Sequence, residues 1–92
     1  MPQIFKFGPY LVYFWSNENE PIEPIHVHIS IGKPSKNSTK IWITKSKKCL
    51  VANNNSNIPE KTLKLILRML ENNIELITQK WLEHFEDISY FC

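Results

Sequence analysis

The sequence contains few glycines, with only Gly8 and Gly32 among its 92 residues. A glycine-rich loop that cradles phosphate groups needs several glycines at short spacing, so this kind of nucleotide site is excluded. No Gly-x-Ser-x-Gly or Cys-x-x-Cys motif occurs either. The sequence therefore shows no sign of an α/β-hydrolase nucleophile or of a thioredoxin-like dithiol.

Cysteines and long apolar runs are also scarce. Cys49 and Cys92 allow only one disulfide, whereas small secreted domains usually carry several, so we expect two reduced thiols, with Cys49 in the core and Cys92 frayed. The longest uncharged apolar run covers residues 10–16, far short of the roughly 20 residues of a membrane helix. No basic segment followed by an apolar one opens the chain. We expect a cytoplasmic protein without a membrane partner.

Acidic residues are absent from the middle of the chain. Residues 33–59 contain six lysines and no Asp or Glu, while the flanking segments are each net negative. Such a basic region could attract nucleic acid or an acidic protein. Alternatively, its lysines protect an edge hairpin from aggregation. The nucleic-acid hypothesis assigns contacts to Lys40, Trp42, Lys45, Lys47 and Lys48.

The apolar pattern predicts one α+β domain over residues 1–92, with a sheet in residues 1–52. Alternating residues predict strands at 3–7, 10–16, 26–31, 39–44 and 48–52, and so an antiparallel sheet of four to five strands. Val27, Ile29 and Ile31 share one face of their strand, and the core should also take Ile41 and Ile43. That pairing places Lys40 and Trp42 on the same face as His26 and His28.

A helical pattern follows in residues 57–88, where apolar residues recur at spacings of three and four. It predicts one long C-terminal helix over about residues 59–87, with Asn57 as its cap. Asn72 and Asn73 form the only weak point, where the helix could kink or break. The helix and the two-sided apolar second strand offer more apolar surface than a small core buries, so we expect a protein partner or self-association.

His26-x-His28 is the clearest chemical signal in the sequence. Period two in a strand places both imidazoles on one face, roughly 7 Å apart at the backbone. With Glu23 just upstream, the three residues could act as catalytic acid and base groups at a phosphate or RNA. Alternatively, the histidines are structural, bonded to the Glu-Pro loop and packed on Trp42. No further ligand has a recognised metal spacing, so no metal or other cofactor is expected.

Several segments resemble the bacterial domain-of-unknown-function family 4160. They are Met1-Pro2-Gln3-Ile4, the aromatic second strand, Glu23-Pro24-Ile25-His26-Val27-His28-Ile29, Lys40-Ile41-Trp42-Ile43 and Trp81-Leu82-Glu83-His84-Phe85. Glu-Pro-x-His-Val-His is the most specific of them, and Ile25 departs from the proline often found there. Such proteins are often encoded beside another short protein, in an arrangement similar to toxin–antitoxin pairs.

The resemblance implies a component of a two-gene module, with the product of the neighbouring gene as its partner. One hypothesis is that this component acts on RNA through its His-x-His face. The alternative is a non-enzymatic, protein-binding or antitoxin-like module.

Overall fold

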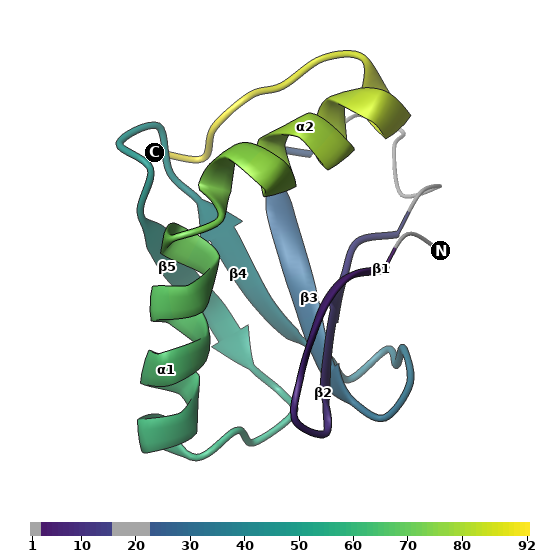
Figure 1. The fold of residues 1–92 in the computed structure, drawn as a ribbon, viewed down its shortest axis with the longest axis vertical. Helices are drawn as coiled ribbons and strands as arrows, with labels where there is room; N and C mark the ends of the chain where they lie inside the picture. The colour runs from purple at the N-terminus through teal and green to yellow at the C-terminus, as the bar shows by residue number, and fades with distance from the viewer. Residues whose placement is uncertain (1–2, 16–22) are drawn as a thin grey trace.

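The computed structural model describes residues 3–15 and 23–92. In this part, a five-stranded antiparallel sheet is followed by two helices, and each strand pairs with its neighbour in sequence (Figure 1). The elements are β1 (Gln3–Phe7), β2 (Tyr10–Tyr13), β3 (His26–Ile31), β4 (Thr39–Ile43), β5 (Cys49–Asn54), α1 (Glu60–Glu71) and α2 (Ile74–Phe85). The predicted α+β class and antiparallel sheet are confirmed.

The strands differ slightly from the predicted bounds. β2 ends at Tyr13, because Phe14 leaves the ladder and packs against Trp81, with 5.5 Å between the ring centroids. Residue 16 lies outside the described residues. β5 extends to Asn54, which pairs with Thr39. The expectation that the sheet ends before the asparagine tract was therefore wrong by two residues.

The predicted pairing of β3 with β4 is confirmed. Val27 faces Ile41, His26 faces Trp42 and His28 faces Lys40. Cross-strand partners project to the same side of a sheet. Val27 and Ile41 therefore share one face, and the two histidines share the opposite face with Trp42 and Lys40.

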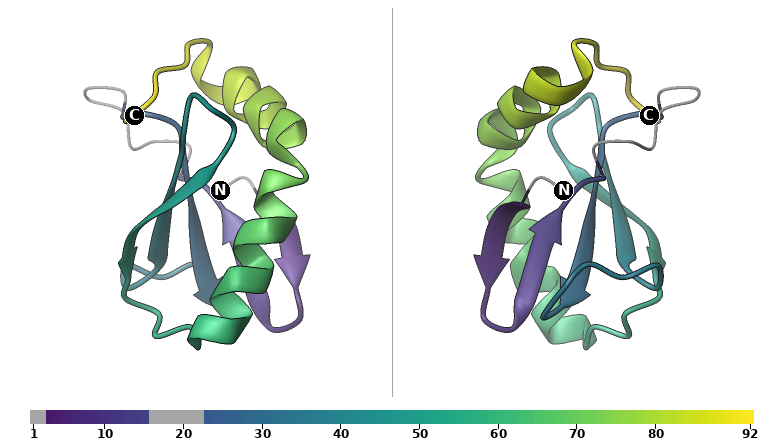
Figure 2. Two further views of the ribbon diagram at one scale, coloured as in Figure 1. Left: turned by 90° about the vertical axis from the view of Figure 1, so that its left-hand side faces the viewer. Right: turned by 90° about the vertical axis from the view of Figure 1, so that its right-hand side faces the viewer.

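The helices cover the apolar face of the sheet. α1 runs alongside β5, and α2 lies across one end of the sheet (Figures 1 and 2). The main core contains Val12, Val27, Ile29, Ile41, Ile43, Ile66, Leu70, Ile77, Trp81 and Phe85, all buried. Ile31 was expected in this core but is 59% exposed. It is the last residue of β3 and pairs with Tyr10, at the end of the strand away from α2 (Figure 1).

The helical segment forms two helices, so the prediction of one long helix was wrong, although the break falls at the expected asparagines. One helix over residues 59–87 would be about 43 Å long, whereas the molecule measures 32 × 26 × 19 Å. The turn at Asn72 and Asn73 lets both apolar stripes reach the sheet. Asn57 does not cap α1: it has a φ of 54°, and Pro59 occupies the N-cap position.

Residues 86–92, here called the C-terminal tail, fold back onto the sheet. The backbone N–H of Ile25 donates to the Ser89 carbonyl at 2.9 Å, and that of Lys45 donates to the Cys92 carbonyl at 2.9 Å. The expectation of a frayed Cys92 was therefore wrong. Among the helices of the described residues, none has the length and apolar character needed to cross a bilayer.

Candidate functional site

His26 and His28 project from β3 on the face opposite Val27 and Ile29, and both are buried, with exposures of 0% and 9%. Their ring centroids are 4.9 Å apart and the rings are nearly perpendicular. Trp81 packs against His26 at 5.4 Å, and Tyr13 stacks on His28 at 5.7 Å. The pair is thus enclosed by aromatic side chains.

The Nδ1 atom of each imidazole makes a hydrogen bond to a nearby residue of the chain. His26 Nδ1 lies 2.8 Å from the Pro24 carbonyl, which can only accept, so this nitrogen donates. His28 Nδ1 lies 2.9 Å from the Ser38 hydroxyl. These bonds fix both ring orientations. The bond of His26 to Pro24 and its contact with Trp42 are those of the structural alternative. His28 differs, because its bond goes to Ser38 in the turn before β4 and its ring stacks on Tyr13.

Lys40 and Trp42 lie beside the histidines on the neighbouring strand, as the strand pairing predicted, and Glu23 contacts Lys40. The Lys40 ammonium is 2.8 Å from Glu23 Oε1 and 4.3 Å from the centroid of the Trp42 ring. Lys40 therefore makes both an ion pair and a cation–π contact. A phosphate at Lys40 would have to compete with the Glu23 carboxylate.

Two residues that the sequence did not single out complete this surface. Phe91 stacks on Trp42, with 4.8 Å between the ring centroids and 5° between the ring planes, and it is 57% exposed. Leu50 is the cross-strand partner of Trp42 and is 42% exposed. We call Lys40, Trp42, Leu50 and Phe91 the Trp42 surface. Hairpin register could have indicated Leu50, but no local pattern predicts that the tail brings Phe91 there.

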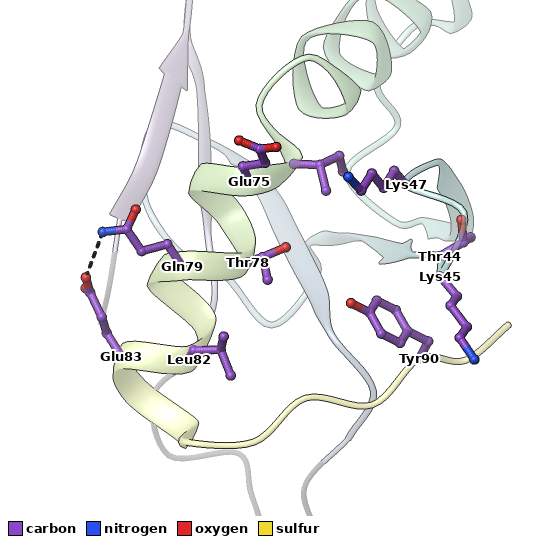
Figure 3. A pocket seen from close by; sticks show the side chains of 10 residues that line it. Thr44, Lys45, Lys47, Glu75, Thr78, Gln79, Leu82, Glu83 and Tyr90 are labelled. Atoms are coloured by element: carbon purple, nitrogen blue, oxygen red, sulfur yellow. Dashed lines mark hydrogen bonds between the residues drawn. The ribbon is translucent and has the colours of Figure 1, made fainter.

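The remaining predicted nucleic-acid contacts lie elsewhere. Lys45, Lys47 and Lys48 are exposed in the turn between β4 and β5. Lys45 and Lys47 line a cleft of about 650 Å³ between this turn, α2 and the C-terminal tail (Figure 3). Neither histidine lines the cleft. Of the five predicted contacts, Lys40 and Trp42 therefore lie on the Trp42 surface, Lys45 and Lys47 line the cleft, and Lys48 is exposed in the turn outside both.

Cys49 does not provide a reactive thiol near neutral pH. Burial, together with the nearby Glu71 carboxylate, raises the pKa of Cys49 from its usual value of 9.0 to about 12. The thiolate, which is the nucleophilic form, is therefore suppressed. Within residues 3–15 and 23–92, no three His, Cys, Asp or Glu side chains are grouped so that they could hold a metal ion.

Comparison with curated proteins and with solved structures gives no significant match. A family model does match residues 10–82, which run from β2 into α2. The matched range includes the histidine pair, Lys40 and Trp42, and it ends before Phe91. The chain therefore belongs to the family described as "Domain of unknown function (DUF4160)", the family that its motifs resemble.

Proposed function

We propose that this chain is the binding component of a two-gene module similar to toxin–antitoxin pairs, and that it carries out no chemistry of its own. The burial of the histidine pair is the observation that carries this proposal. A general acid or base must come within hydrogen-bond reach of the proton it moves. A ring that is 0% exposed, as His26 is, offers no surface to an RNA substrate.

The Trp42 surface supports a protein as the partner. Aromatic residues are enriched at the centres of protein interfaces, where a partner removes them from water. Phe91 and Leu50 are large apolar side chains that this chain leaves about half exposed, beside the Glu23–Lys40 ion pair. In this proposal the partner is the product of the neighbouring gene, and the two proteins meet in the cytoplasm.

Co-expression with the neighbouring gene tests the proposal. Phe91→Ala and Leu50→Lys should abolish co-purification of the partner. Leu65→Lys is the matched control, because Leu65 is 48% exposed on α1, away from the Trp42 surface, and should leave co-purification intact. The chain expressed alone should not slow growth. Growth arrest that is lost in His26→Ala and His28→Ala variants, both shown to be folded by circular dichroism, would instead support the catalytic hypothesis.

RNA binding is the second candidate, favoured by the parallel Trp42–Phe91 stack. Exposed aromatic rings stack on unpaired bases, and nearby lysines attract the backbone. Titration of a labelled single-stranded RNA at several salt concentrations would test it. If RNA binds, Lys45→Ala and Lys48→Ala should each reduce the salt slope by about one. A slope unchanged by either variant would contradict RNA contacts at these lysines.

A further inference from the structure

The cleft beside α2 has the size and lining of a site for a small ligand. Its volume of about 650 Å³ falls within the usual range for such sites. Three segments that are distant in sequence build it, namely the β4–β5 turn, α2 and the C-terminal tail. Leu82, Ile74 and the ring of Tyr90 provide apolar walls.

Three hydrogen-bond donors face this cleft. Figure 3 shows the Thr78 and Tyr90 hydroxyls directed toward one another across it, while Lys47 extends toward α2 near its first turn. Within the described residues, none of these three side chains has a hydrogen bond or an ion pair. They are therefore available to an acceptor that enters the cleft.

The acidic residues of the lining restrict the charge of that acceptor. Glu83 points away from Tyr90 and accepts a bond from Gln79 at 3.4 Å (Figure 3). Glu75 lies at the same end of the cleft as Lys47, and the two form no ion pair within 4 Å. The Glu75 carboxylate would repel a doubly charged phosphate more than a singly charged carboxylate. Lys45 also lines the cleft, but Figure 3 shows its side chain directed away from the Thr78 and Tyr90 hydroxyls. With Lys47 as the cation that extends toward α2 and Glu75 beside it, the lining favours a ligand with one negative charge.

We propose that the cleft binds a carboxylate attached to a short apolar body. The carboxylate accepts from the Lys47 ammonium and from the hydroxyls of Thr78 and Tyr90, and the apolar body packs on Leu82 and the Tyr90 ring. A small organic acid and an acidic peptide side chain both offer this chemistry. The site is separate from the Trp42 surface and does not depend on the proposed function.

The backbone at Lys47 supports a role for this side chain. Lys47 has a φ of 66°, a left-handed conformation that favours glycine, and its N–H donates to the Thr44 carbonyl within the turn. A glycine here would relieve the strain and remove the ammonium. Lys47→Gly therefore separates ligand binding from stability, because the two should change in opposite directions.

Titration followed by ¹H–¹⁵N NMR tests the site with defined probes. Hexanoate should shift the amide signals of Thr78, Leu82 and Tyr90, and hexanamide, which has the same length without the charge, should bind about tenfold more weakly. The dipeptide N-acetyl-leucyl-glutamic acid α-amide, in which only the α-carboxyl is amidated, carries its one carboxylate on the glutamate side chain. If this peptide binds more tightly than hexanoate, the carboxylate that the cleft recognises belongs to a peptide side chain. The reverse order would show that it belongs to a small organic acid.

The variants give the second readout. Lys47→Gly should raise the melting temperature and weaken hexanoate binding about tenfold, and Tyr90→Phe should weaken binding about threefold at an unchanged melting temperature. Lys36→Gln changes an exposed lysine outside the cleft and should have no effect. Equal binding of hexanoate and hexanamide, absence of shifts, or unchanged affinity in Lys47→Gly would each overturn the proposal.

Discussion

The backbone N–H of Cys49 donates a hydrogen bond to Oε2 of Glu71, with 3.1 Å between the two atoms. Cys49 is the first residue of β5 and Glu71 is the last residue of α1. A carboxylate at the end of a helix is disfavoured by the helix dipole, because that end carries partial negative charge. This bond offsets the cost and ties the end of α1 to the edge strand of the sheet.

Removing this acceptor should destabilise the fold. Glu71→Ala is expected to lower the free energy of unfolding by about 1 kcal/mol, because the Cys49 N–H loses its partner. Glu71→Gln keeps an oxygen acceptor at nearly the same position and should lose less. Urea unfolding monitored by circular dichroism measures both variants. Equal losses in the two would show that the charge, not the hydrogen bond, is the stabilising factor.

The raised pKa of Cys49 predicts a stability loss in alkaline solution. The unfolded chain releases this proton near pH 9.0, whereas the folded chain keeps it until about pH 12. The contribution to stability is therefore fully present below pH 9 and is lost as the pH rises toward 12. Urea unfolding between pH 7 and 11 should show this decline. Cys49→Ala should show a shallower one.

Thiol labelling provides an independent check on the same residue. Iodoacetamide at pH 8 should modify the exposed Cys92 first, and Cys49 only when the protein unfolds. Mass spectrometry after limited labelling distinguishes the two sites. Rapid modification of Cys49 in the folded protein would contradict the suppressed thiolate.

Asn54 should be the most sensitive position of the asparagine tract. Its Nδ2 donates to the Ile58 carbonyl at 2.9 Å, and its Oδ1 accepts from the Ile58 N–H at 3.0 Å and from the Thr39 hydroxyl at 2.7 Å. Asn54→Ala should cost about 2 kcal/mol, because three bonds are lost at once. Asn54→Asp retains the acceptor and should cost less. Asn55→Ala, at an exposed position, is the matched control.

His26 should contribute to stability more than to any reaction. His26→Ala removes a ring that contacts Trp42 and Trp81, together with the bond to Pro24, and should cost about 3 kcal/mol. His84→Ala, an exposed histidine on α2, should cost less than about 1 kcal/mol. Thermal unfolding of the two variants and of the wild-type protein measures both losses of stability. A His26→Ala protein with wild-type stability would remove the structural explanation for this residue.

The antiparallel sheet and the faces of β3 and β4 could be predicted from the sequence, because the residues of these strands alternate and each strand pairs with its neighbour in the chain. The alternation of Val27, Ile29, Ile41 and Ile43 predicts that His26 and Trp42 share a face, and the structure adds that the two are direct cross-strand partners. Local patterns did not predict that both faces of β3 are buried. The second face is covered by distant groups, including the 32–38 turn, whose Ser35 N–H donates to the Tyr13 hydroxyl at 3.1 Å.

The cleft and the Phe91 stack could not be predicted, because both depend on the path of the tail after α2. Glu86 ends α2 with a φ of 59°. The tail is then held by two backbone hydrogen bonds, to Ile25 and to Lys45. Backbone bonds of this kind leave no mark in side-chain patterns. The charge pattern did locate Lys45 and Lys47, but it could not show that they line a separate cleft.

The C-terminal tail links the two surfaces that this molecule presents. Two adjacent tail residues belong to different surfaces, since Tyr90 lines the cleft and Phe91 stacks on Trp42. A ligand that restrains Tyr90 also restrains Phe91, because the two residues are adjacent in the tail. The loss of conformational entropy in the tail then accompanies the first binding event and is smaller for the second. Occupation of the cleft should therefore strengthen binding at the Trp42 surface. By thermodynamic reciprocity, binding of the partner should raise the affinity of the cleft for its ligand by the same factor.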